Sequence, residues 1–549
     1  MPTLQFKGKN IIWNHHLSVP YHALDDVSKL SYKPEIANGN LIIEGDNLLA
    51  LKSLLPLYAG QIHCIYIDPP YNTGNEGWVY NDNVNSPLIK DWLGKEVGKD
   101  DLTRHDKWLC MMTPRLKLLR DLLADDGAIF ISIEDNEVYN LRAVMNEIFG
   151  EENFVAEFVW KKRTGSNDSK EFWRTTDHEY VVSYAKTNLF QFAGIEKTFL
   201  NYSNPDNDPR GDWAVDNLTC NKTSAERPHL FYDITDPKTN ITYKCNPNRV
   251  WVYEPDRMKR LIKEGKVIFP KDGKGTPTYK RHLSEVRSNK KPLSTWVISR
   301  SENEEIDEEI LSLQFPLNMV ATKQLTELMG SLVFNNPKSV DMIKQIVYQA
   351  TDVDSVILDS FAGSGTTAHA ILDLNKEDGG NRKFILVQMT EATPAEPKKN
   401  ICKDITRERV KRAIDKFGYK SGFEYMRVGL PIDSESLLAG KLPAIEQFGS
   451  YVFFLCTGEK TTKPVKSIEK NLYLAGSQGN ADIYLIYSQD YEELTRLALN
   501  LDWAEKIVTS DKKRYIVYAP ACFLDEDYLR SKQIEFVNIP YGLFQRKEN

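Results

Sequence analysis

An acid, two prolines and an aromatic ring directly follow an apolar strand early in the chain. Residues 65–67 predict a buried parallel strand, and Asp68, Pro69, Pro70 and Tyr71 come next. Because prolines cannot continue a β-ladder, the chain must leave the sheet at Asp68, in the crevice where open α/β sheets bind ligands. The turn presents a carboxylate, a free backbone carbonyl and a ring. These groups suit a flat base with an amino group, because the oxygens accept its hydrogens while the ring covers its π-face.

The same turn also has a purely structural interpretation, since Asp-Pro-Pro is common loop chemistry after a strand. A second motif favours the functional one. Residues 356–358 predict another apolar strand, and 359–367 read Asp-Ser-Phe-Ala-Gly-Ser-Gly-Thr-Thr before a helix-forming run. The glycines let the backbone approach a ligand closely, and the start of the helix offers unpaired N–H groups to a carboxylate. Together the two motifs predict a ligand site.

The paired motifs resemble those of the DNA amino methyltransferases that use S-adenosyl-L-methionine. Their order, with the catalytic motif first and a target recognition domain between the motifs, resembles the β class of this family. The sequence is more similar still to the modification subunits of Type III restriction systems. That similarity is carried by Leu41–Asn47, Asp68–Gly74, His105–Trp108, Gly127–Glu137 and Asn336–Lys338. The resemblance implies methyl transfer from S-adenosyl-L-methionine to N6 of a flipped adenine.

The resemblance also implies roles for individual residues. The implied catalytic residues are Asp68, Pro69, Pro70 and Tyr71. The implied cofactor-binding residues are Asp46, Asp359, Phe361, Gly363, Gly365, Thr366, Lys338, Gln388 and Glu391. Asp46 would face the cofactor adenine, and N-capping of the following helix is a compatible alternative. The ribose contact falls on Gln388, Glu391 or both, because the sequence has Gln388 where many family members have an acid.

Composition bounds the class of protein. The chain has 549 residues, 41% hydrophobic and 27% charged, which is typical of a soluble globular protein with three or four domains. No apolar run after the N-terminal lysines suggests a signal peptide, and no window of about 18 apolar residues suggests a membrane span, so we expect a cytoplasmic protein. Seven scattered cysteines have no zinc spacing, and we expect no metal site.

A local positive region stands out in this acidic protein, whose net charge is −7. Residues 201–300 contain 19 Lys and Arg against 12 Asp and Glu, and aromatic residues lie among them. A solvated charged domain is the structural alternative, but the position between the two motifs favours DNA recognition. The loop 72–99 is also expected to contact DNA. The predicted DNA-binding residues are Lys161, Lys162, Arg163, Arg249, Arg257 and Arg260.

We predict an α/β fold with a Rossmann-like doubly wound methyltransferase sheet, an inserted target recognition domain and a small C-terminal α/β domain. The predicted domains are an N-terminal arm at 1–35, a catalytic half at 36–160, the insert at 161–334, a cofactor-binding half at 335–417 and an interaction domain at 418–549. In the last domain we expect strands at 451–456, 471–474, 483–487, 515–518 and 534–539 and a helix at 491–500.

Alternatives concern the target base and the role of the chain. N4-methylation of cytosine is chemically near-identical to N6-methylation of adenine. A second alternative is that the chain serves chiefly as the DNA-recognition subunit that targets a separate ATP-dependent nuclease. It has no Gly-x-x-x-x-Gly-Lys-Ser/Thr motif and hence no recognisable ATPase motor. We therefore expect double-stranded DNA, a separate restriction (helicase-nuclease) subunit and a second copy of this chain in a homodimer as partners, and no membrane.

Overall fold

The computed structural model describes residues 3–73, 101, 103–163, 175–271, 273–300, 312–391, 398–460, 463–510 and 512–539. The chain divides into two compact units, of which the second comprises residues 194–293. The first unit contains the flanking parts of the chain and is built on one large sheet. Apart from residues 72 and 73, the predicted DNA-contacting loop lies outside the described residues.

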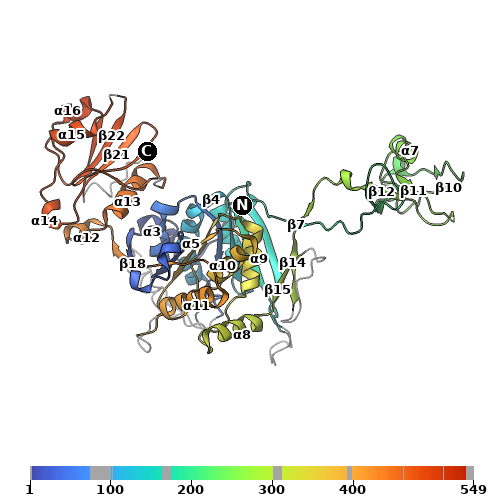
Figure 1. Cartoon of the computed structure of the whole chain (residues 1–549), viewed down its shortest axis with the longest axis horizontal. Helices are drawn as coiled ribbons and strands as arrows, with labels where there is room; N and C mark the ends of the chain where they lie inside the picture. Colours follow the sequence, from blue (N-terminus) through green and yellow to red (C-terminus); the bar gives the residue numbers. More distant parts are fainter. Residues whose placement is uncertain are drawn as a thin grey trace. The chain divides into compact units, whose positions relative to one another are not determined.

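An eleven-stranded sheet organises the first unit (Figure 1). Neighbouring strands are parallel from β18 to β4, and β1 and β6 pair antiparallel with the two ends of this block. The strands lie in the order β1 (His22–Asp26), β18 (Glu424–Pro431), β2 (Leu41–Glu44), β17 (Lys383–Gln388), β16 (Val356–Asp359), β3 (Ile62–Ile67), β4 (Leu123–Ile133), β6 (His178–Ala185), β5 (Phe154–Lys161), β14 (Ser294–Arg300) and β15 (Ser312–Pro316).

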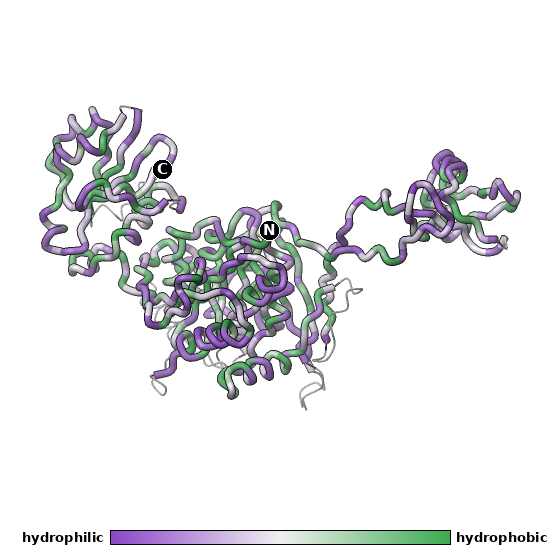
Figure 2. Tube along the Cα trace, in the orientation of Figure 1, coloured by the Kyte–Doolittle hydropathy of each residue, from purple (hydrophilic) through white to green (hydrophobic). Residues whose placement is uncertain are grey.

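The central strands are apolar because helices cover both of their faces. Ile65, Ile67, Leu358 and Ile385 are fully buried, and Figure 2 shows the hydrophobic runs within the sheet. One helix group consists of α3 (Asn47–Tyr58), α5 (Arg104–Leu122) and α6 (Val138–Phe149). The other consists of α8 (Asn318–Met329), α9 (Val340–Ala350), α10 (Thr366–Asp378), the π-helical turn η6 (Cys402–Arg407) and α11 (Glu408–Phe417). No helix in the described ranges is long and apolar enough to cross a membrane.

The direction of winding changes between β3 and β16. From β3 the chain proceeds to β4, whereas from β16 it proceeds the other way to β17. Because crossovers between parallel strands are right-handed, the two directions put their helices on opposite faces. The register pairs Ile357 with Cys64 and Leu358 with Ile65, so both strands end at the same edge. The predicted doubly wound sheet is confirmed, and its switch point lies between the two predicted motifs.

The second unit has its own small core. Its buried residues include Leu218, Leu230, Val250, Trp251 and Met258. The elements are β7 (Ile195–Glu196), β8 (Trp213–Asn217), η4 (Pro228–Leu230), β9 (Ile234–Thr235), β10 (Thr242–Tyr243), α7 (Pro255–Lys263), β11 (Val267–Ile268), β12 (Thr278–His282), η5 (Leu283–Glu285) and β13 (Lys290–Lys291). This unit is narrower than the predicted insert at 161–334, because β6, β14 and β15 belong to the large sheet.

The helix predicted at 491–500 ends at Leu494, and the C-terminal region differs from the prediction in two further ways. First, β18 lies inside the large sheet, so the boundary predicted at residue 418 is too early. Second, the strand predicted at 451–456 is part of a helix, α13, which buries Phe448, Tyr451 and Val452 at helical spacing against the core around Leu51 and Leu54. The elements here are α12 (Ser434–Leu438), α13 (Ile445–Thr457), β19 (Lys466–Glu469), β20 (Leu472–Gln478), β21 (Ala481–Ile486), α14 (Tyr491–Leu494), α15 (Leu501–Ile507), β22 (Arg514–Ala519), α16 (Glu526–Ser531) and β23 (Ile534–Asn538).

The N-terminal arm also joins the fold instead of merely packing on it. Its strand β1 completes one edge of the large sheet by pairing with β18. The short helices α1 (Lys9–Ile12), α2 (His15–Ser18), η1 (Ser28–Leu30), η2 (Pro34–Ile36) and η3 (Glu151–Asn153) complete the first unit. Edge strands need little hydrophobic sequence, and the prediction therefore missed β1.

Separate cores predict separate unfolding of the two units. Trp251→Ala should destabilise the second unit by about 3–5 kcal/mol, because it empties the centre of that unit's core. Calorimetry should show its transition moving to lower temperature while the transition of the large sheet stays in place. Phe130→Ala, in β4, is the matched control and should move the other transition. One transition that shifts as a whole in both variants would contradict the division.

Candidate active site

The turn after β3 is held from two helices. Trp108 in α5 donates its ring N–H to the Pro70 carbonyl at 2.7 Å. Asn72 has a left-handed backbone, with φ 59°, and donates its side-chain amide to the buried Glu137 carboxylate before α6. His105 Nδ1 lies 2.6 Å from the same carboxylate. The backbone around Asp68 and Tyr71 is therefore fixed on both sides, as a site that must position a ligand requires.

Asp68 lies against a buried ammonium group at the carboxyl end of β3. Lys338 Nζ lies 3.4 Å from Asp68 Oδ1, and it donates to the Tyr71 hydroxyl oxygen at 2.5 Å and to Glu179 Oε2 at 2.8 Å. Burial raises the pKa of the Asp68 carboxyl, the Lys338 charge opposes this rise, and the Glu179 charge adds to it. The charge of Lys338 thus favours the ionised form of Asp68.

The charged network extends from Glu179 along the sheet edge. Lys162 Nζ lies 3.2 Å from Glu179 Oε1 and also pairs with Glu134. Burial alone would raise the pKa of Glu179, but Lys338 and Lys162 together hold it below the usual value. Each Glu179 oxygen therefore has its own lysine, so this carboxylate stays ionised despite its burial.

Two lysines predicted to bind ligands pair with carboxylates of the same network. Lys338, predicted as a cofactor contact, donates to Glu179 at 2.8 Å and lies 3.4 Å from Asp68, and its contact with a cofactor stays a prediction. Lys162, predicted as a phosphate contact, is nearly buried between its two acids. Of its neighbours, Arg163 pairs with Asp177 at 2.9 Å, whereas Lys161 is exposed. The local sequence identified these cations but not their partners, which come from distant strands.

The loop after β16 is organised by Asp359. Its carboxylate accepts the Phe361 backbone N–H at 3.0 Å and the Thr367 hydroxyl at 2.5 Å. Burial raises the pKa of Asp359 to about 7. Gly363 has φ 52°, and a Cβ there would come within 3.2 Å of the Phe334 ring. The sequence pattern is thus explained by a tight loop in which a side chain at 363 has no room.

A buried arginine holds the far side of this loop. Gly365, with φ 80°, is the N-cap of α10, and Thr366 is the first helical residue. Arg409 donates to the hydroxyl oxygens of Ser364 and Thr366, both at 2.6 Å. Burial lowers the pKa of Arg409 to about 9. The Thr366 hydroxyl donates in turn to the Lys338 backbone carbonyl at 3.2 Å, which connects the loop with the network at Asp68.

The remaining predicted cofactor contacts border the same loop. The Gln388 side chain accepts the Gly363 N–H at 2.7 Å and donates to Glu391 Oε1 at 3.0 Å. Asp46 accepts two backbone N–H groups in the first turn of α3, at 2.9 and 3.2 Å, so its N-cap role is confirmed. The direct contacts of Gln388, Glu391 and Asp46 with a cofactor stay predictions.

Sequence reasoning did not assign Trp108, Glu137, Glu179 or Arg409 to the site. Two of them left a signal, because Glu179 and Arg409 are charged residues among apolar neighbours of one strand and one helix. Glu179 interrupts the strand 178–184, and Arg409 lies on the buried side of α11. Buried charges require partners, so such positions point to a polar network.

The predicted DNA-binding residues of the second unit are exposed. Arg249, Arg257 and Arg260 lie on its surface, and no carboxylate among the described residues pairs with them. The Arg257 guanidinium lies over the Tyr253 ring at 4.5 Å. In contrast, the aromatic residues Tyr243, Trp251 and Tyr279 are core residues. The arginines therefore remain available to phosphates, whereas most of the interleaved aromatics serve packing.

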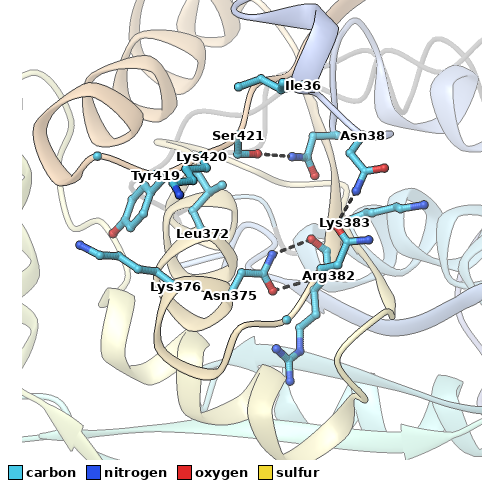
Figure 3. Close-up of a pocket in the computed structure, with 14 residues that line it drawn as sticks. Ile36, Asn38, Leu372, Asn375, Lys376, Arg382, Lys383, Tyr419, Lys420 and Ser421 are labelled. Atoms are coloured by element: carbon cyan, nitrogen blue, oxygen red, sulfur yellow. Dashed lines mark hydrogen bonds between the residues drawn. The ribbon is translucent and has the colours of Figure 1, made fainter.

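A separate cavity of about 380 Å³ lies at the opposite edge of the sheet (Figure 3). It is lined by residues at the starts of β2, β17 and β18 and by residues of α10, among them Asn38, Lys383 and Asn375. Its amides largely bind the surrounding backbone, as in the pair that Asn375 forms with Arg382 at 2.9 and 3.0 Å. It shares no residue with the Asp68 network. Within the described ranges, no group of three or more His, Cys, Asp or Glu could hold a metal ion.

Comparison with known proteins identifies a family. The model of a DNA methylase family matches residues 62–415. The StyLTI Mod subunit of a Type III restriction-modification enzyme from Salmonella typhimurium is 36% identical over 71% of this chain and 60% of its own length. The corresponding EcoP15I Mod subunit of Escherichia coli is 28% identical over 90% of this chain and 82% of that protein. The Type II methyltransferase M.KpnI of Klebsiella pneumoniae is 30% identical over 66% of this chain and 84% of that protein. This chain thus spans about three fifths of the first of these relatives.

Removing the Trp108 hydrogen-bond donor should lower the stability of the protein measurably. Trp108→Phe keeps an aromatic ring but leaves the Pro70 carbonyl without its donor. The free energy of unfolding should therefore fall by about 0.5–1.5 kcal/mol. Trp160→Phe is the matched control, since the buried Trp160 ring N–H has no acceptor among the described residues. Urea titrations should therefore show the larger loss for Trp108→Phe. Equal losses would mean that this hydrogen bond contributes nothing to the turn.

Proposed function

Because this chain belongs to the DNA methylase family, we propose that it is a site-specific DNA methyltransferase. It transfers a methyl group from S-adenosyl-L-methionine to N6 of a flipped adenine in double-stranded DNA. One observation carries the proposal: the Asp68–Tyr71 turn and the glycine loop lie at the carboxyl ends of the neighbouring strands β3 and β16. An acceptor base at the turn and a donor at the loop would share one crevice, which the transfer requires.

The glycine loop fits the methyl donor. Gly363 carries no side chain that could cover its backbone, so a ligand can approach the loop closely. The first backbone N–H groups of α10, from Thr366, suit the methionine carboxylate. When bound, S-adenosyl-L-methionine supplies an electrophilic methyl group on its sulfonium. Asp359 and Arg409 stabilise the loop by hydrogen bonds to Phe361 and Thr366. We expect the ligand to contact the loop through its backbone N–H groups.

The turn fits an exocyclic amino group. The amino nitrogen of adenine is a poor nucleophile, because its lone pair is delocalised into the ring. Hydrogen bonds to the Asp68 carboxylate and the Pro69 carbonyl favour a tetrahedral nitrogen, and the carboxylate stabilises the positive charge that develops on it. Tyr71 covers the face of the base. Cytosine carries the same group at N4 and is the second candidate. The resemblance favours adenine because family members whose motif begins with aspartate more often act on it.

The wider role follows from the chain's relatives. We propose that it is the modification and recognition subunit of a Type III restriction-modification system, as the names of two relatives describe those proteins. A separate restriction subunit would then supply the ATP-dependent nuclease, for which this sequence has no phosphate-binding motif. The basic second unit would read the DNA sequence. A homodimer and a cytoplasmic location complete the proposal.

Two substitutions should separate the two halves of the site. Asp68→Ala should lower methyl transfer roughly a hundredfold or more and leave cofactor binding intact, because Asp68 faces the base. Gly363→Val should abolish cofactor binding, because its side chain meets Phe334 and its backbone has φ 52°. The measurements are transfer of tritiated methyl groups to unmodified duplex DNA and calorimetry with S-adenosyl-L-methionine. An active Asp68→Ala protein, or unchanged cofactor affinity in folded Gly363→Val, would contradict the assignment.

Exposed arginines of the second unit should contribute to DNA affinity. Replacing Arg257 and Arg260 by alanine should weaken binding to all sequences and reduce the slope of log K against log salt by about one per lost phosphate contact. Lys383→Ala is the control, because Lys383 lines the cavity at the edge opposite Asp68. Fluorescence anisotropy over a salt series measures both slopes. Equal slopes for the double variant and the wild type would remove these arginines from the interface.

A further inference from the structure

The ammonium group of Lys338 lies beside Asp68 and Tyr71, where we expect the amino group of the target base to bind. Lys338 Nζ lies 3.4 Å from Asp68 Oδ1 and 5.0 Å from the centre of the Tyr71 ring. A target amine would likewise donate to Asp68 while its base contacts Tyr71. The inference below therefore rests on the proposed function and extends it to a residue with no assigned part in the reaction.

The three acceptors around Lys338 Nζ are unequal. The Tyr71 hydroxyl oxygen lies at 2.5 Å and Glu179 Oε2 at 2.8 Å, whereas Asp68 Oδ1 lies at 3.4 Å. A distance of 3.4 Å is beyond the usual range of a charge-assisted hydrogen bond. The contact with Asp68 is therefore the weakest of the three. An incoming amine can replace it while the other two contacts keep the ammonium group in place.

Several charged or titratable groups face Asp68 from different elements. They are Tyr66 on β3, Tyr71 on the turn, Glu179 on β6, Asp359 on β16 and Lys338 before α9. Lys338 is the only cation among them. Burial and the charge of Glu179 favour the neutral form of Asp68, which would accept a hydrogen bond from the target amine less well than the ionised form does. Lys338 supplies the opposing charge.

We propose that Lys338 is a positioning residue that keeps Asp68 ionised and yields its contact with Asp68 to the target amine while remaining bound to Glu179. Glu179 is needed for this role, because its contact with Lys338 is shorter than that of Asp68 and its negative charge balances the ammonium group. Lys162 secures Glu179 from the other side at 3.2 Å. A balanced pair matters, because an unbalanced cation would oppose the positive charge that develops on the target amine.

Substitutions at the two positions should move the acid limb of the pH–rate profile in opposite directions. In Lys338→Met the pKa of Asp68 rises, so single-turnover methylation should require a pH higher by about one unit or more. In Glu179→Gln a negative neighbour is lost and Lys338 turns fully to Asp68. The acid limb should then move to lower pH, and a higher DNA concentration should be needed for half-maximal rate. Lys338→Arg keeps the charge and should retain the acid limb of the wild type.

The experiment uses the full chain and a duplex with a sequence that the wild type methylates, over about pH 5 to 9. Calorimetry with S-adenosyl-L-methionine reports folding of each variant and tests cofactor binding separately. Unchanged cofactor affinity with opposite shifts of the acid limb is the expected result. A merely structural lysine would not produce opposite shifts.

Three results would overturn the inference: an acid limb of Lys338→Met that coincides with the wild type, activity lost at every pH, or lost cofactor affinity. The last would return Lys338 to the cofactor site. An inactive wild type would overturn the proposed function itself, and this inference with it. An active wild type with an unmoved acid limb would overturn the inference alone.

Discussion

The pairing of β3 with β16 is the interaction on which the site depends. The two strands are almost 300 residues apart in the chain, yet Cys64 pairs with Ile357 and Ile65 with Leu358. The turn at Asp68 and the loop at Gly363 therefore follow neighbouring strand ends at one edge of the sheet. Methyl transfer between a base and a donor requires that the groups at those two strand ends face a common ligand space.

Buried charged side chains surround the turn at Asp68. Asp68 and Glu179 are placed where burial favours neutral carboxyl groups, and Lys338 and Lys162 compensate. Removing one partner from such a set is costly, because an uncompensated charge is left behind. At the glycine loop after β16, Arg409 donates to the hydroxyl groups of Ser364 and Thr366 and has no carboxylate partner among the described residues. A hydrogen bond from the Thr366 hydroxyl to the Lys338 carbonyl connects the glycine loop with the network around Asp68.

The sequence predicted correctly those elements whose signal lies in consecutive residues. The strand before Asp68, the glycine loop and the helices around them follow from apolar runs that end in special turn residues. What it missed depends on long-range pairing. The partners of Lys338 and Lys162 lie on strands far away in the sequence, and residue type alone cannot identify them. The helix α13 was mistaken for a strand because a short apolar run suits either, and the insert was drawn too wide because β6, β14 and β15 pair with the large sheet.

The two units differ in what they carry: the large sheet holds the Asp68 turn and the glycine loop, and the second unit has exposed arginines over its own core. Single-molecule sequencing of DNA from cells that express this chain reports which base, if any, the proposed methyltransferase modifies. We expect N6-methyladenine within one defined sequence, and none in cells that express Asp68→Ala. N4-methylcytosine alone would contradict the assignment of the base, and unmodified DNA would contradict the assignment of the reaction.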